Sequence, residues 1–191
     1  NPQSKMRLAI FEENGNHHDM RRALGHASML IACREQGNFL LTSCPANALQ
    51  PYNHHDNGWD QGQEFFTPDK VWLQPCAWAQ AMASAAHRDV LVASVVEGPA
   101  VEVSTTRDDA GRSVVLHVVN GAKEARKLVV DLGDGASWTL TCAVCLSADS
   151  PTDHNPPDDP ERIRPRDVTE SFHQSPQLLP ESYLVLTYTR P

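Results

Sequence analysis

The chain of 191 residues has few basic side chains, with 16 Lys and Arg against 24 Asp and Glu, and its formal net charge is -8. Binding to nucleic acid needs a clustered basic face, so this balance argues against a nucleic-acid partner. No apolar run approaches the roughly 20 residues that cross a bilayer. The composition therefore excludes a nucleic-acid-binding footprint and a membrane-spanning helix, and it favours a neutral or small partner.

The number of cysteines is five, which is odd, so at least one has no partner for a disulfide within the chain. A disulfide framework cannot be read from such a set. The sequence also has no Asn-x-Ser/Thr glycosylation site. The compartment stays open, with an extracellular or endomembrane-lumenal location favoured.

Two histidine pairs, His17-His18 and His54-His55, are each followed by an aspartate and suggest a metal site. Adjacent side chains point apart, however, and neither pair has the i, i+4 spacing of a helical zinc site. Cys142 and Cys145 have the spacing of a redox pair, but residues three apart on a strand face opposite sides. We therefore expect solvated histidines, two buried structural thiols, no metal and no cofactor.

The apolar run 6–11 at the start of the chain ends in two acids, Glu12 and Glu13. A short buried strand with a carboxylate at its C-terminal tip is how parallel α/β barrels present catalytic residues. The alternative is that the acids open a solvated loop or lie near a helix N-terminus, where negative charge is favourable. Because only five residues precede the run, we expect the chain to be the latter part of a larger enzyme.

The next segments predict a parallel strand–helix–strand unit. Apolar residues recur at helical spacing from Met20 to Ile31, Asn16 or Asp19 could cap this helix, and Gly37 follows its end. A short apolar run over 38–44 then reads as the second strand.

Beyond this unit, the segment 45–70 reads as a long polar loop, ordered by its aromatic residues. A helix is expected over 71–87, begun near Pro75. From Val90 the sequence predicts antiparallel strands separated by turns, and the run 149–165 with its prolines predicts an extended, hydrogen-bond-poor excursion over the surface. The predicted strands cover residues 90–96, 101–106, 113–120, 127–131, 138–146 and 182–189.

With these elements in order, the chain resembles the C-terminal part of the α-L-arabinofuranosidases of glycoside hydrolase family 51. The motifs that carry the resemblance are Leu8-Ala9-Ile10-Phe11-Glu12-Glu13, Ala23-Leu24-Gly25-His26-Ala27, Gln74-Pro75, the strand 112–120 and the proline-rich turn 155–163.

The resemblance implies a mixed fold, α/β plus all-β. Residues 1–89 would form the last βαβα portion of a (β/α)8 TIM barrel, with its strands 7 and 8, and residues 90–191 an antiparallel, jelly-roll-like β-sandwich. Two barrel strands alone leave open edges and an open core. An N-terminal chain would therefore have to complete the barrel, and a homo-oligomer is left open.

The resemblance also implies a retaining hydrolysis of terminal α-L-arabinofuranosyl residues from arabinose-containing glycans. Glu12 is then our first choice as nucleophile and Glu13 the alternative, with the acid/base on the separate upstream chain. Asn47 stands where similar enzymes place an amide near the sugar. Trp59 could form an apolar wall against the sugar, or it could only hold the long loop against the barrel. An alternative hypothesis, of a different functional class, is that the chain is a non-catalytic structural or carbohydrate-binding component derived from such an enzyme.

Overall fold

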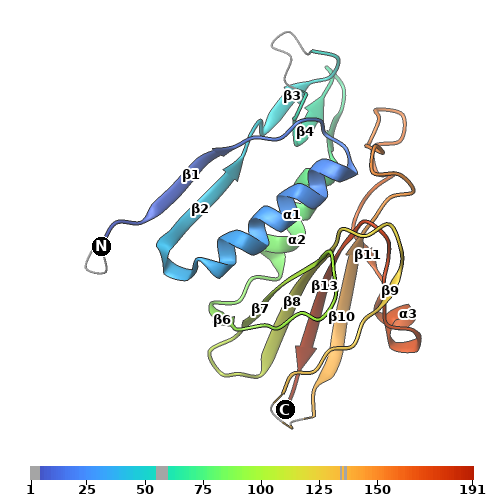
Figure 1. Ribbon diagram of the computed structural model, residues 1–191. Coiled ribbons are helices and arrows are strands. Elements are labelled where there is room, and N and C mark those ends of the chain that lie inside the picture. Colours follow the sequence, from blue (N-terminus) through green and yellow to red (C-terminus); the bar gives the residue numbers. More distant parts are fainter. Residues whose placement is uncertain (1–4, 55–59, 134, 136) are drawn as a thin grey trace.

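The computed structural model describes residues 5–54, 60–133, 135 and 137–191. Its fold is mixed α/β and consists mostly of sheets. Helix α1 lies between a pair of parallel strands, β1 and β2, and a six-stranded antiparallel sheet (Figure 1). None of the helices in these ranges combines the length and the hydropathy of a membrane-spanning segment.

The N-terminal unit is the predicted parallel strand–helix–strand. β1 (Leu8–Glu13) pairs in parallel with β2 (Leu40–Pro45), and α1 (Met20–Glu35) connects them through a short 3-10 helix, η1 (Gly37–Phe39). Asp19 is the N-cap of α1, because its carboxylate accepts a hydrogen bond from the backbone N–H of Arg22 at 3.1 Å. The parallel pairing is confirmed, as is Asp19 among the two expected caps.

The segment after β2 contains more regular structure than the sequence predicted. It forms a small three-stranded sheet in the order β3 (Leu49–Pro51), β4 (Glu64–Phe66) and β5 (Val71–Leu73). Helix α2 (Pro75–Ala85) begins at Pro75, as expected, whereas Val71 to Leu73, which the expected helical range also covered, form β5 instead. The reason is Pro75 itself, which disfavours a helical backbone at Gln74, where the chain is extended.

The six-stranded sheet has the order β11-β10-β13-β8-β7-β6, and all its pairings are antiparallel. Two of its strands match the predicted ranges, β8 at 113–120 and β13 at 182–189. The remaining strands of this sheet are β6 (Val90–Val92), β7 (Val101–Arg107), β10 (Thr139–Leu146) and β11 (Arg166–Asp167).

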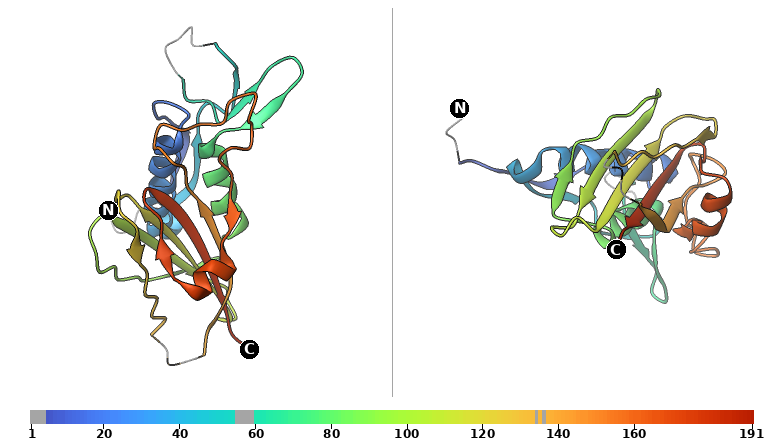
Figure 2. Two further views of the ribbon diagram at one scale, coloured as in Figure 1. Left: turned by 90° about the vertical axis from the view of Figure 1, so that its right-hand side faces the viewer. Right: turned by 90° about the horizontal axis from the view of Figure 1, so that it is seen from below.

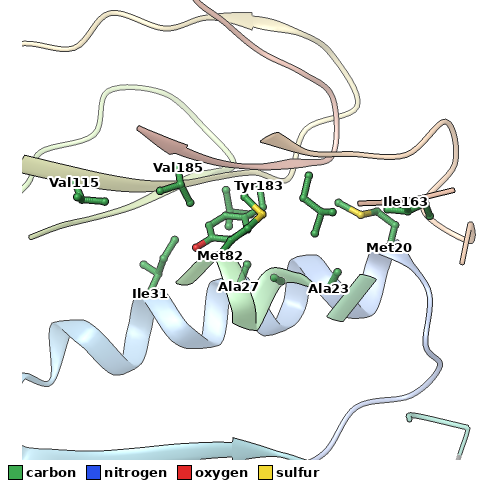
Figure 3. Packing of buried hydrophobic residues seen from close by; sticks show 12 residues of the cluster. Met20, Ala23, Ala27, Ile31, Met82, Val115, Ile163, Tyr183 and Val185 are labelled. Atoms are coloured by element: carbon green, nitrogen blue, oxygen red, sulfur yellow. The ribbon is translucent and has the colours of Figure 1, made fainter. Parts of the chain in front are cut away.

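One face of this sheet packs on the helices. Met20, Ala23, Ala27 and Ile31 line one side of α1 and meet sheet residues that include Tyr183 (Figure 3). Apolar residues of α2 join the same buried cluster. The hydrophobic core is therefore continuous across residue 89, and the division of the chain at that point stays a prediction.

A thin layer covers the opposite face of the sheet. It contains the paired strands β9 (Arg126–Lys127) and β12 (Gln177–Leu178) and the short helix α3 (Thr169–Gln174). Phe172 and Leu178 from this layer are buried in a second apolar cluster with residues of β8, β10 and β13. Among the described residues, the second layer is thus a strand pair and a helix rather than a second broad sheet.

The proline-rich run 149–165 lies beside the ends of both helices (Figure 2). The carbonyl oxygens of Asp153 and Pro151 accept hydrogen bonds from the N–H groups of Met20 and Arg21, in the first turn of α1. These N–H groups have no partner within a helix, so the run supplies the acceptors that the helix cannot.

Asn155 fixes the centre of the run and is fully buried. Its carbonyl oxygen accepts from Trp72 Nε1 at 2.7 Å and from Gln74 Nε2 at 2.8 Å, and its N–H donates to Gln74 Oε1 at 3.0 Å. Its amide side chain contacts backbone atoms of Leu73 and Ile163. The expectation of a hydrogen-bond-poor excursion was therefore wrong, because partners distant in sequence satisfy this segment.

Candidate functional site

The two acids that end β1 have different environments. Glu13 is 7% exposed, whereas Glu12 is exposed. The register of the parallel pair shifts here, since three steps from Ile10 to Glu13 face only two steps from Ser43 to Pro45. Such an irregularity changes the direction of side chains and is common next to functional sites. The two carboxylates are therefore presented in different environments, one buried and one exposed.

The carboxylate of Glu13 is held by two residues of α1. Arg22 donates through Nη1 to Oε1 at 2.8 Å, and Nδ1 of His26 lies 2.6 Å from Oε2. Burial alone would raise the pKa of Glu13, but the hydrogen bond and charge of His26 and the charge of Arg22 together hold this pKa below its ordinary value. The contacts of Glu13 therefore join the end of β1 to α1 and favour its ionised carboxylate.

The second ring nitrogen of His26 extends this network to α2. Nε2 of His26 lies 2.8 Å from Oε1 of Gln80, and the histidine is fully buried. Both ring nitrogens of His26 thus have a side-chain partner. The end of β1 is linked in this way to both helices.

Glu12 has a side-chain contact of a different kind, with a neutral amide. Its Oε1 accepts a hydrogen bond from Nδ2 of Asn14 at 3.0 Å. Asn14 in turn accepts through Oδ1 from Nε2 of Gln61 at 2.8 Å, and Oε1 of Gln61 accepts from the backbone N–H of Gly15 at 3.0 Å. An exposed carboxylate is therefore connected to a buried amide, Gln61, which is 3% exposed.

Asn47 lies just after β2, on the neighbouring strand end, and its side chain is partly exposed. The peptide bond between Ala46 and Asn47 is cis, and the carbonyl oxygen of Asn47 accepts from the N–H of Gln63 at 3.0 Å. The N–H of Ala46 donates to the carbonyl oxygen of Glu13 at 3.0 Å. The ends of β1 and β2 are thus tied together, which brings the segments that carry Glu12 and Asn47 to one edge. Trp59 lies outside the described residues.

The expectation of a solvated loop histidine was wrong for His18, because its side chain is only 15% exposed. Nδ1 of His18 lies 2.9 Å from a carboxylate oxygen of Asp60, and its ring meets those of Phe65 and His154 edge-on. Burial lowers the pKa of His18, which Asp60 partly opposes. This cluster joins three loops. In the described ranges, no group of three or more His, Cys, Asp or Glu side chains is placed to hold a metal ion.

Sequence reasoning missed the partners of both acids. Arg22 and His26 are four residues apart, so they share one face of a helix that follows the strand directly. This i, i+4 spacing of an arginine and a histidine after an acidic strand end was the available signal for Glu13. Asn14 and Gln61 gave no signal, because a contact across 47 residues has no sequence pattern.

The fold is similar to that of several solved glycosidases. The arabinose-bound MgGH51 α-L-arabinofuranosidase superposes with a TM-score of 0.74 at 16% identity, over 94% of this chain and 28% of its own. The Thermotoga petrophila GH51 α-L-arabinofuranosidase gives 0.74 at 14%, over 95% and 43%. The Thermotoga maritima α-L-arabinofuranosidase, solved as an arabinose complex, gives 0.69 at 14%, over 97% and 41%.

The chain thus spans between 28% and 43% of the length of these enzymes. No curated protein sequence shows significant similarity to it. The model of the α-L-arabinofuranosidase C-terminal domain matches residues 10–178, which is most of the chain. The chain therefore belongs to the α-L-arabinofuranosidase C-terminal domain family, as the resemblance in its motifs predicted.

Proposed function

We propose that this chain supplies the nucleophile Glu12 to a retaining α-L-arabinofuranosidase that acts on arabinose-containing glycans. Family membership and the fold support this activity class. β1 and β2 would then be strands 7 and 8 of the catalytic barrel, and the antiparallel sheet with its covering layer would be the family's β-sandwich.

The observation that carries the proposal is the contrast between the two acids. A nucleophile must reach the anomeric carbon, so its carboxylate has to be accessible. Both carboxylate oxygens of Glu13 are engaged with Arg22 and His26, and the residue is buried. Glu12 is exposed, and the hydrogen bond from Asn14 engages one of its two carboxylate oxygens. This favours Glu12 over Glu13.

In the proposed reaction, the carboxylate of Glu12 attacks the anomeric carbon while a general acid protonates the departing glycosidic oxygen. Water then attacks the covalent arabinosyl–Glu12 ester, and the same acid/base residue takes its proton. Retaining enzymes place these carboxyl groups about 5–5.5 Å apart. Because the adjacent Glu13 is bound to α1, the acid/base would come from the upstream chain.

Asn47 would donate to one sugar hydroxyl and accept from another, since an amide carries both functions. Trp59 would provide an apolar wall for the pentose ring.

Exposed apolar side chains on the parallel pair support completion of the barrel by another segment. Phe11 is 79% exposed, Leu41 59% and Leu8 43%. Within the described residues, β1 and β2 pair only with each other. Apolar side chains gathered on an open parallel pair favour a covering partner, here the N-terminal part of the barrel.

The test uses the chain assembled with the partner that completes the barrel. A mechanism-based covalent arabinofuranosyl inhibitor should label the peptide that contains Glu12, and Glu12→Gln should lose both labelling and turnover. Azide should restore turnover to Glu12→Gly and yield the arabinosyl azide of inverted configuration, because azide replaces the missing nucleophile.

Asn16→Asp, a conservative change of a nearby exposed residue, is the matched control and should retain activity. Labelling at another residue with full activity in Glu12→Gln would remove Glu12 from the mechanism. A complete barrel that binds arabinosides without turnover would favour the non-catalytic, carbohydrate-binding alternative.

A further inference from the structure

The hydrogen-bond chain behind Glu12 has a fixed direction. It begins at the backbone N–H of Gly15, which can only donate, so the side-chain atom of Gln61 that faces it at 3.0 Å must be the oxygen. The remaining atom of that amide is then the NH2 group, which donates to Asn14 at 2.8 Å. One backbone group thus determines the orientation of the Gln61 amide.

The same logic determines the orientation of Asn14. Because Gln61 presents a donor, the atom of Asn14 that receives it must be the oxygen, Oδ1. The NH2 group of Asn14 is left to face Oε1 of Glu12 at 3.0 Å. A flipped Asn14 amide would place oxygen against the carboxylate and NH2 against NH2, so both of its contacts would be lost.

The structure assigns a positioning role to Asn14: it is oriented by Gln61 to donate a hydrogen bond to Glu12 and to hold that carboxylate in its attacking direction. This inference rests on the proposed function of Glu12 as nucleophile. Asn14 acts through Glu12, and Gln61 acts through Asn14. A hydrogen bond from a fixed donor to a charged acceptor is among the stronger ones in proteins.

Gln61 is well placed to act in this way. It is 3% exposed and lies between β3 and β4 of the small sheet, and the adjacent N–H of Gly62 donates to the side-chain oxygen of the buried Gln50 at 2.8 Å. Glu13, next to Glu12, is fixed to α1. The backbone on one side of Glu12 and the donor to its carboxylate are therefore both supported by buried groups.

A purely structural reading competes with this role: Asn14 and Gln61 would only tie the β1–α1 loop to the small sheet. Asn14→Asp separates the two readings, because one oxygen of the new carboxylate can still accept from Gln61 while the other replaces the donor to Glu12. The tether survives in Asn14→Asp, and the donor does not. Asn14→Ala removes both.

The experiment measures the rate constant for covalent labelling of Glu12 and kcat/KM on an activated aryl α-L-arabinofuranoside, in the assembled enzyme. Asn14→Ala should lower both by roughly 10- to 100-fold, the range expected for one lost charge-assisted hydrogen bond. Asn14→Asp should lower them at least as much, since a second carboxylate faces Glu12. The inhibition constant of arabinose, a non-covalent competitor, should stay unchanged in both variants.

Substitutions of Gln61 provide an independent test of the positioning role. Gln61→Glu keeps the acceptor for Gly15 but presents oxygen to Asn14, which should turn the Asn14 amide and direct its oxygen at Glu12. The variant should therefore be slower than Gln61→Met, although glutamate is the closer isostere. Thermal unfolding of each variant identifies any that does not fold. If a Gln61 variant does not fold, the comparison rests on Asn14→Asp, which changes an exposed residue.

Wild-type rates in Asn14→Asp, with lower rates only in Asn14→Ala, would overturn the positioning role. Asn14 would then only connect the β1–α1 loop to the small sheet. Gln61→Glu at or above the rate of Gln61→Met would do the same. Both outcomes apply only if the inhibitor labels Glu12 in the unsubstituted enzyme. If the proposed function is wrong, the inhibitor labels another residue, so the two failures can be distinguished.

Discussion

The carboxylate of Glu13 lies 2.6 Å from Nδ1 of His26, and both side chains are buried at the junction of β1 and α1. Arg22, one helical turn earlier, donates to the other carboxylate oxygen. The strand end is therefore fixed to the helix by charge as well as by packing. Since Glu12 is adjacent, the geometry of the proposed nucleophile depends on this buried group.

Replacing Glu13 with glutamine should destabilise the fold strongly. The substitution keeps the shape but leaves Arg22 and His26 buried without an anion, and breaking a buried ion pair on one side typically costs about 3–5 kcal/mol. Urea denaturation measures the free energy of unfolding. Glu12→Gln is the matched control, because it changes an exposed neighbour and should stay within about 0.5 kcal/mol. Equal effects of the two substitutions would contradict the anchoring role.

The same group gives a pH dependence with a definite sign. The pKa of Glu13 is lowered in the folded state from its ordinary value of 4.5, so its contribution to stability is present above about pH 4.5 and is lost as pH falls through the folded-state pKa. Below pH 4.5 the free energy of unfolding should therefore fall more steeply in the wild type than in Glu13→Gln. Parallel curves in this range would show that Glu13 does not carry the acid sensitivity.

Asn155→Ala should release the proline-rich run from the helices. The substitution removes the side-chain hydrogen bonds to Leu73 and Ile163 and leaves buried backbone groups without partners. We expect a loss of about 2–4 kcal/mol in the free energy of unfolding and faster amide exchange at Met20 and Arg21. The exposed Asp158, substituted by alanine in the same run, should change neither. Unchanged exchange in Asn155→Ala would contradict a clamping role for this residue.

The sequence predicted elements whose patterns are local. β8 and β13 were placed correctly because each is a long β-rich run bounded by turn residues, and each pairs along its whole length with the other. The strands β3 to β5 have three residues each, too few for periodicity to distinguish them from a loop.

The sequence also predicted only part of the candidate site. The acid pair stood out because an apolar strand delivers it, but its two members could be separated only after Arg22 and His26 were seen to face Glu13. Asn155 was missed for a related reason. Prolines predict a segment without regular hydrogen bonding, and they carry no information on partners 81 residues away such as Gln74.

His117 should make the fold sensitive to mild acid. It is fully buried on β8, with Nδ1 2.7 Å from the hydroxyl of Tyr183. Burial, followed by the charges of Arg34 and His87, lowers its pKa from 6.5 to about 3. Between these values the unfolded chain binds a proton that the folded chain does not, so this group lowers stability by about 1.4 kcal/mol per pH unit as pH falls.

His117→Gln removes the titration and keeps a side-chain oxygen that can accept from Tyr183. Denaturation midpoints at about pH 6 and pH 5, above the range of the carboxylates, should therefore fall less in the variant than in the wild type. His173→Gln, at an exposed histidine that does not contribute to the pKa shift of His117, is the control and should leave the slope near that of the wild type. A wild-type slope in His117→Gln would show that His117 is not buried in its neutral form.

Thiol reactivity should separate the cysteines by burial. Burial raises the pKa of Cys76 to about 12 and that of Cys145 to about 11, and only the thiolate reacts with alkylating agents. Cys33, Cys44 and Cys142 are partly exposed, and the structure holds all five cysteines as free thiols. Burial also raises the pKa of Cys33 and Cys142, but their thiols are accessible to the reagent. Iodoacetamide at about pH 8 should therefore modify the three partly exposed cysteines in the native protein and reach Cys76 and Cys145 only in urea, as peptide mass spectrometry can follow.

The cysteine experiment also tests the spacing of Cys142 and Cys145, which lie three apart on β10. Cys145 is 5% exposed, as expected, but Cys142 is partly exposed, so the expectation of two buried thiols was wrong for Cys142. Residues three apart on a strand face opposite sides, which explains the difference. Cys142→Ser should then leave the slow labelling of Cys145 unchanged. Mutual protection, in which loss of Cys142 exposes Cys145 to the reagent, would instead indicate that the two thiols form a functional pair.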